Sequence, residues 1–212
     1  MKTIPRVLWL VVLAGFCCMT LVAQDAMAPA KPKAAKPAGE KQAAGMAMPM
    51  PKPAPEMTKL IKTLSGNWNV TEKHEVNPMM PNGGEGKGTA RIWAGPGGMS
   101  LVENYSSSGA MGSFKGMGTW WWDPKAQVYH GLWCDNMTPN GCDTSGSTKW
   151  DGDKLVGTMQ GDTSGQMMTM RFIYSEFKPD SFVMTMEMGP DASKLQKAMT
   201  VTYTKAAAPG KM

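Results

Sequence analysis

Two cysteines beyond the N-terminal apolar run, Cys134 and Cys142, are the clearest candidates for chemistry in this sequence. They flank the segment DNMTPNG, whose Asn, Pro and Gly residues are typical of a turn between two antiparallel strands. Facing residues of such strands have Cα atoms about 4.5–5.5 Å apart, which is within disulfide range. A redox pair would need Cys-x-x-Cys spacing, and a zinc site would need more ligands than the 2 histidines of the chain supply. We therefore predict a structural disulfide.

Methionine is frequent, with 22 residues, and several of these have Met-x-Met spacing. Thioethers are soft ligands that suit Cu(I). The candidate copper ligands are Met46, Met48 and Met50 near the N-terminus and Met184, Met186 and Met188 in a later segment. On a strand, the later three would project from one face together with Phe182, and an adaptable apolar lining explains them without a metal. We predict no cofactor, with copper as the alternative.

An aromatic hairpin, KGMGTWWWDPKAQVYHGLW, is the best candidate for the wall of a ligand site. A four-residue turn at 123–126 would pair Trp122 with Gln127 and Trp120 with Tyr129. This register places large rings beside three glycines, and such an arrangement can leave an apolar cavity. The alternative is that the glycines let the strands bend at barrel corners. The aromatic residues predicted to bind a ligand are Trp68, Trp120, Trp122, Tyr129 and Trp133.

Two arginines, Arg91 and Arg171, fall in the middle of predicted strands, whereas most other basic residues are lysines. Our hypothesis is that one or both face the lumen and bind an acidic head group through a bidentate fork. An outward arginine in a surface ion pair is the alternative.

The sequence favours a protein without catalytic residues. A nucleophile needs a base within hydrogen-bond reach and a third group that orients this base. The sequence has no Gly-x-Ser-x-Gly element, and its only histidines are His74 and His130. Most aspartates fall in turns, where turn geometry explains them.

Turn signals recur about every ten residues between Glu56 and Lys205, with short β-branched and aromatic runs between them. A short helix is expected at 56–64. Strands are expected at 67–75, 87–94, 99–106, 113–122, 127–135, 145–150, 154–161, 167–176, 181–188 and 197–204. So many short strands with tight connections predict an all-β antiparallel meander that closes into a barrel, because closure removes the exposed edges.

Two resemblances agree with this fold. Gly66 and Trp68 form a Gly-x-Trp element that is similar to the start of the first strand in lipocalins and fatty-acid-binding proteins. Nearly the whole domain resembles DUF1579, a bacterial family of unknown function. The matching residues are Gly116, Gly118, Thr119, Trp122, Asp123, Tyr129, Trp133, Asp135, Tyr203, Thr204 and Lys205. The resemblance implies a lipocalin-like barrel and no particular activity.

The N-terminal residues predict export. Residues 1–24 have the basic start and apolar run of a signal peptide, with an uncleaved membrane anchor as the alternative. Residues 25–55 form an Ala/Pro/Lys-rich linker, 56–205 the barrel domain and 206–212 a flexible tail. The net charge of +5 belongs mainly to the first 55 residues. The domain itself is near neutral, which argues against nucleic-acid binding, while the basic linker allows a weak association with an anionic envelope surface.

Together these observations predict a periplasmic or secreted, non-catalytic barrel that binds a small apolar or amphipathic molecule in its lumen. The alternatives are a methionine-based Cu(I) binder and a structural or interaction module with a packed barrel.

Overall fold

The structure is a computed structural model that describes residues 50–77, 80–144, 146–163 and 165–207. The predicted signal peptide and residues 25–49 of the predicted linker lie outside these ranges, as do Met46 and Met48. In the part of the chain that is described, no helix is long and apolar enough to cross a membrane.

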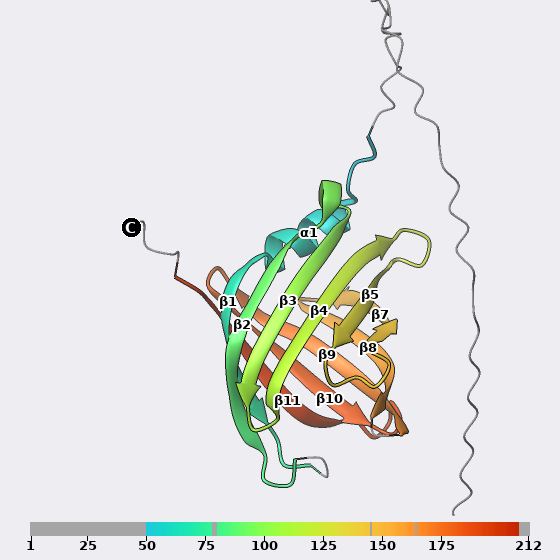
Figure 1. Ribbon diagram of the computed structural model, residues 1–212. Helices are drawn as coiled ribbons and strands as arrows, with labels where there is room; N and C mark the ends of the chain where they lie inside the picture. The colour runs from blue at the N-terminus through green and yellow to red at the C-terminus, as the bar shows by residue number, and fades with distance from the viewer. Residues whose placement is uncertain (1–49, 78–79, 145, 164, 208–212) are drawn as a thin grey trace, which may run out of the picture. The chain divides into compact units, whose positions relative to one another are not determined.

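One antiparallel sheet closes on itself to form a barrel, with the helix α1 (Pro55–Leu64) before it (Figure 1). The strands are β1 Gly66–His74, β2 Gly84–Ala94, β3 Ser100–Gly109, β4 Gly112–Asp123, β5 Val128–Asp135, β6 Cys142–Thr144, β7 Ser147–Asp151, β8 Lys154–Thr163, β9 Gln166–Lys178, β10 Ser181–Gly189 and β11 Gln196–Lys205, and a short 3-10 helix, η1 Pro96–Gly98, lies between β2 and β3. The sheet order is β4-β3-β2-β1-β11-β10-β9-β8-β7-β5-β6, and the pairing of β4 with β5 closes the ring.

The predicted all-β antiparallel barrel is confirmed. The helix and all ten expected strands are present within a few residues of their predicted ends, and the expected strand at 145–150 is β7. The short strand β6 was not predicted. It pairs with β5 at Leu132–Cys134, while β7 pairs with β5 at Tyr129, so β6 and β7 occupy successive parts of one edge of β5. A strand of three residues is too short for period-two alternation to reveal.

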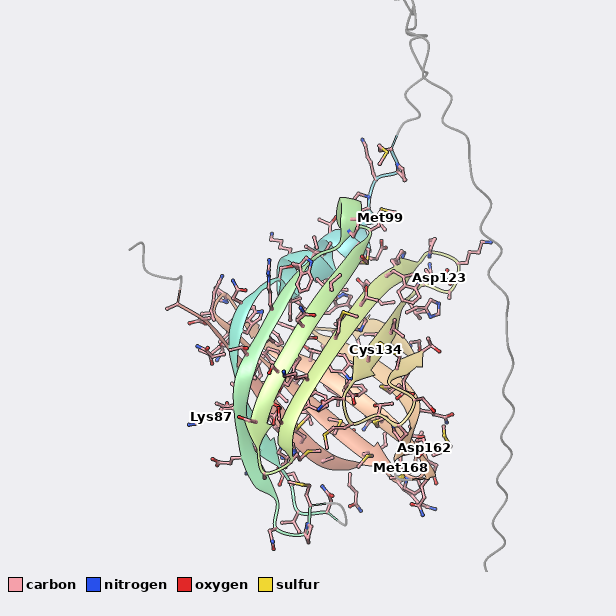
Figure 2. The ribbon with its side chains drawn as sticks, in the orientation of Figure 1. Lys87, Met99, Asp123, Cys134, Asp162 and Met168 are labelled. Carbon is pink, nitrogen blue, oxygen red and sulfur yellow. A yellow bond between two sulfur atoms is a disulfide. The ribbon has the colours of Figure 1, made fainter. Side chains whose placement is uncertain are left out.

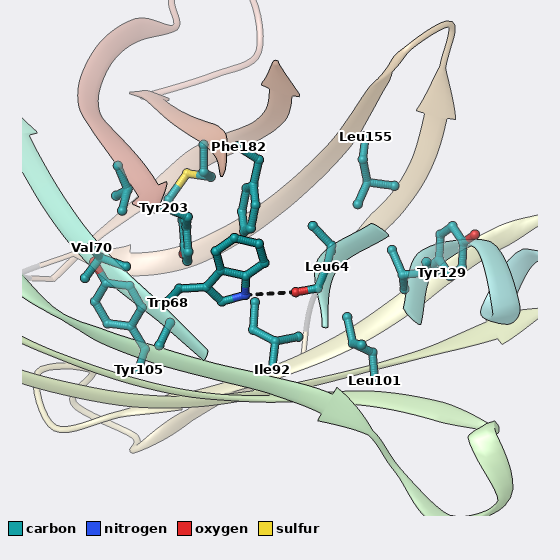
Figure 3. Close-up of a cluster of buried hydrophobic side chains, with 14 of the residues drawn as sticks. Leu64, Trp68, Val70, Ile92, Leu101, Tyr105, Tyr129, Leu155, Phe182 and Tyr203 are labelled. Atoms are coloured by element: carbon teal, nitrogen blue, oxygen red, sulfur yellow. Dashed lines mark hydrogen bonds between the residues drawn. The ribbon is translucent and has the colours of Figure 1, made fainter. Parts of the chain in front are cut away.

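The helix α1 lies across one end of the barrel because its apolar residues share one face (Figure 1). Met57, Leu60 and Leu64 are almost fully buried. The indole Nε1 of Trp68 donates a hydrogen bond of 3.0 Å to the carbonyl oxygen of Leu64, and Figure 3 shows this bond in the packed interior. The bond satisfies one of the carbonyls that a helix leaves free in its last turn.

Tyr129 connects the helix to β5 and β7, the neighbouring strands of the ring with the fewest paired residues. Between β5 and β7 only one residue pair, Tyr129 with Thr148, is in register in the described residues. The hydroxyl of Tyr129 donates to the carbonyl oxygen of Glu56 at 2.8 Å and accepts a bond of 3.3 Å from Nε1 of Trp150. Side-chain bonds from β5 to both β7 and α1 therefore supplement the sparse backbone pairing.

The predicted disulfide between Cys134 and Cys142 is confirmed. The two residues face each other on β5 and β6, with Cα atoms 3.9 Å apart. In the intervening turn the Asp135 carboxylate accepts bonds from the backbone N–H groups of Met137 and Thr138. A disulfide indicates an oxidising compartment.

The predicted register of the aromatic hairpin was wrong by two residues. Trp122 faces Tyr129 and Trp120 faces Gly131. The loop spans 124–127 because Gln127 takes a left-handed conformation (φ 55°), and its N–H donates to the Asp123 carbonyl oxygen at 2.8 Å. A shift by an even number of residues leaves every side chain on its predicted face.

Candidate functional site

The barrel interior is densely packed at the helix end. The indole of Trp68 lies between Phe182, Tyr203 and Ile92 beneath the helix (Figure 3). The cavity between this cluster and the middle of the barrel has a volume of about 10 Å³. Such a volume holds about one water molecule, whereas small-molecule pockets begin at about 300 Å³. This end of the lumen is therefore core.

The opposite end of the barrel is lined by apolar side chains that face inward but keep part of their surface accessible. These residues, which we call the mouth, are Phe114, Trp133, Met170, Met186, Met188 and Met199. Met199 shares the inner face of β11 with the buried Val201 and Tyr203, and Met186 shares that of β10 with Phe182. In Figure 2, Met168 of β9 marks this end, far from Met99 near α1. These inward side chains therefore keep apolar surface accessible to solvent.

The glycines of the aromatic hairpin do not leave a cavity, contrary to one of the two predicted interpretations. The rings of Trp120 and Trp133 lie directly over Gly118, where a Cβ atom would come within 2.6 Å and 2.8 Å of them. Trp133 also covers Gly116, and it stacks on Phe114 with ring centroids 6.4 Å apart. The glycines allow the rings to lie flat against the sheet, so the rings themselves fill the space.

A first polar cluster lies inside the barrel near the mouth. One carboxylate oxygen of Glu72 accepts a bond of 2.6 Å from the Tyr105 hydroxyl, and the other lies 3.2 Å from Nε2 of His74. All three residues are buried. Burial and the bond to Glu72 raise the pKa of the Tyr105 hydroxyl. Both oxygens of Glu72 are thus engaged, as a buried carboxylate requires.

A second polar cluster lies deeper and centres on Glu103. Its side chain lines the small cavity below the helix together with Tyr174 and Trp120. The hydroxyl of Tyr203 lies 3.4 Å from Oε1 of Glu103, which is long for a hydrogen bond. Desolvation raises the pKa of Glu103 to about 7, and the bond from Tyr203 opposes this shift only in part. Burial also raises the pKa of the Tyr174 and Tyr203 hydroxyls, which stay protonated.

The hypothesis that an arginine faces the lumen was wrong. Arg91 alternates with the buried Ala90 and Ile92, so it points outward, and its guanidinium lies 5.2 Å from the Trp93 ring. It borders an outer groove of about 330 Å³. Arg171 lies on the outer face of β9, where its Nε donates to Glu187 at 2.6 Å. Burial alternates along β2, whereas in β9 the inner face is identified by register: the neighbours of Arg171, Met170 and Phe172, pair with Met188 and Met186 of β10.

The predicted aromatic residues divide into two groups. Trp68, Trp122 and Tyr129 belong to the packing at the helix end, where Trp122 meets Tyr129 with ring centroids 4.9 Å apart. Trp120 lines the small cavity, and Trp133 belongs to the mouth. Tyr129 also lines the small cavity, so three of the five predicted rings border that cavity or the mouth, and their role in ligand binding stays a prediction.

The strand methionines have the predicted common face. Met184, Met186 and Met188 share the inner side of β10 with Phe182, and Met188 is in register with Met170 of β9. Met50, the one described member of the N-terminal group, is 84% exposed. No group of three His, Cys, Asp or Glu side chains among the described residues could hold a metal ion. A metal in the lumen would therefore depend on thioethers.

Sequence reasoning missed the two carboxylates inside the barrel. Glu103 lies in LVENY, on the same side as the buried Leu101 and Tyr105. Glu72 is on the same side of β1 as the buried Val70, which precedes it by two residues. A glutamate at an apolar position of an alternating strand is the signal that could have found both.

The fold and its interior define the class: a small closed antiparallel barrel of the lipocalin-like type, with one plugged end and acidic groups in its lumen. The chain belongs to the family described as "Protein of unknown function (DUF1579)", whose model matches residues 53–205. This confirms the family resemblance seen in the sequence.

One solved structure shares the fold at low identity, and a second is similar with a lower TM-score. The crystal structure of Rv2717c from M. tuberculosis is 12% identical with a TM-score of 0.51, and the match covers 74% of this chain and 100% of that chain. The S-type phycobiliprotein lyase CPES from Guillardia theta is 11% identical with a TM-score of 0.48, and the match covers 72% and 93% of the two chains. No curated protein matches this sequence.

Proposed function

We propose that this barrel is an exported, non-catalytic binding protein that takes one small apolar or amphipathic molecule into its lumen through the mouth. The observation that carries the proposal is the set of inward-facing apolar side chains with accessible surface at that end. Removing apolar surface from water contributes roughly 25 cal/mol per Å², so a ligand that covers these side chains gains affinity from them. The disulfide supports the exported location.

The test uses the neutral fluorescent dye N-phenyl-1-naphthylamine, which brightens in apolar surroundings. We expect saturable binding that weakens about tenfold, or about 1.4 kcal/mol, when Met170→Trp fills the mouth. The matched control is Met117→Trp on the outer face of β4, where the native side chain is 49% exposed. A dye titration that stays linear, or equal losses in the two variants, would contradict lumen binding.

Copper is a second candidate because two thioether residues and one imidazole residue are in register across three neighbouring strands. Met186 of β10 is in register with Met199 of β11, which is in register with His74 of β1. Directly opposite residues have Cβ atoms about 4.5–5.5 Å apart, and thioether and imidazole ligands suit Cu(I).

The copper prediction is tested by anaerobic competition with a colorimetric Cu(I) chelator. We expect the double substitution Met186→Leu and Met199→Leu to weaken Cu(I) binding at least about tenfold while apolar dye binding persists. Met117→Leu is the matched outer-face control. If the native protein does not take Cu(I) from the chelator, the copper role is excluded.

A further inference from the structure

Glu103 has hydrogen-bonding capacity that the protein does not use. Its side chain is only 3% exposed and lines the small cavity at the inner end of the lumen. Among the described residues, the only hydrogen-bond donor to its carboxyl group is the Tyr203 hydroxyl, at the long distance of 3.4 Å from Oε1. No described donor bonds Oε2. It is not among the described side-chain atoms that are fully buried without a partner, so Oε2 keeps accessible surface where Glu103 lines the cavity.

Glu72 provides the contrast within the same barrel. Both of its oxygens have partners, Tyr105 at 2.6 Å and His74 at 3.2 Å. Its environment is complete without a ligand. The environment of Glu103 is incomplete, since no Lys or Arg of the described residues forms an ion pair with it.

The surroundings of Glu103 suit a cation better than an anion. The Trp120 and Tyr174 side chains line the same cavity, and aromatic faces attract ammonium groups. A carboxylate ligand would meet Glu103 and, nearer the mouth, Glu72, so like charges would oppose its entry. The cavity of about 10 Å³ is of the size of a single water molecule, which is also roughly the size of an ammonium group.

We propose that Glu103 is the anchor for a ligand that has an apolar body and a protonated amine at one end. The amine enters the cavity and donates to the unused carboxylate oxygen, while the body extends toward the methionines and aromatic rings of the mouth. This inference rests on the proposed lumen-binding function and replaces the acidic ligand that the arginine hypothesis implied.

The test compares decylamine, decanol and decanoate as competitors of N-phenyl-1-naphthylamine at about pH 8, where Glu103 is mainly ionised and the amine is protonated. We expect decylamine to bind at least about tenfold more tightly than either of the others. Glu103→Gln keeps the size of the side chain but removes its charge, so it should bring the amine and the alcohol to similar affinities. Glu85→Gln is the matched control, because Glu85 is exposed near the start of β2.

The outcomes separate this inference from the proposed function. If the dye binds in the lumen but the amine is no better than the alcohol, the anchor is wrong and the binding function stands. If neither the dye nor any competitor binds, the binding function itself fails. Should Glu103→Gln not fold, the wild-type protein decides: the amine-to-alcohol preference must fall several-fold from about pH 8 to about pH 5.5, and a constant preference overturns the anchor.

Discussion

Phe182→Ala is expected to lower the free energy of unfolding by about 4 kcal/mol, because it leaves a large cavity in the best-packed part of the barrel. The Phe182 side chain is 1% exposed. Its ring stacks on Tyr203 with centroids 4.2 Å apart and meets Trp68 edge-on at 4.9 Å. Each such aromatic pair adds about 0.5–1.5 kcal/mol to the area effect.

The measurement is urea unfolding followed by circular dichroism, with Trp121→Ala as the control. Trp121 lies on the outer face of β4 and is 41% exposed, so its loss should cost less than about 1 kcal/mol. A similar loss in both variants would mean that the helix end of the lumen is not the core of the domain.

The position of Phe182 also connects stability with binding. The ring supports Trp68, whose indole N–H binds the last turn of α1, and Tyr203, whose hydroxyl is the only donor to Glu103 in the described chain. Phe182→Ala should therefore loosen both the helix that plugs the barrel and the donor that orients the carboxyl. The packing around Phe182 therefore positions both the helix plug and the donor to Glu103.

The strands and their faces could be predicted because turn residues and period-two alternation are local signals. The common face of Met184, Met186 and Met188 followed from alternation alone. The hairpin register could not be predicted, because it depends on a left-handed backbone at Gln127, a residue type that gives no sign of it.

The candidate site was harder to predict because it depends on which of two faces points inward. Arg171 lies in a strand that is apolar on both faces, so its outward direction is decided by Glu187 on the neighbouring strand. The carboxylates were missed for the opposite reason: glutamate is rarely buried, and only the closed barrel shows that Glu103 takes an inward position.

The stability of the folded protein should fall as the pH rises because the pKa of Glu103 is raised by folding. Its pKa is about 7 in the folded protein against 4.5 for an ordinary glutamate. Between these values the unfolded chain releases a proton that the folded chain retains, so stability falls as the pH rises from about 4.5 to 7 and then levels off. The expected total loss is about 3 kcal/mol.

Other carboxyl groups act in a different range. The pKa values of Glu75, Asp123 and Asp191 are lowered, by hydrogen bonds from Lys197, from backbone N–H groups, and from Ser193, respectively. At pH values above their ordinary pKa these ionised carboxylates stabilise the fold, and this stabilisation is lost as the pH falls below it. Their effect therefore lies below the pH range in which Glu103 titrates.

Glu103→Gln should abolish most of the fall in stability, so that the variant equals or exceeds the wild type at about pH 8. Urea unfolding at several pH values between about 5 and 8 measures this difference, and Glu85→Gln should keep the wild-type profile. Parallel profiles for Glu103→Gln and wild type would show that Glu103 does not keep its proton in the folded protein. If the amine anchor is correct, decylamine at about 100 times its wild-type Kd should add about 2.7 kcal/mol to the stability of the wild type at about pH 8. The same concentration should add only about 1.4 kcal/mol to Glu103→Gln, whose affinity for the amine is about tenfold weaker.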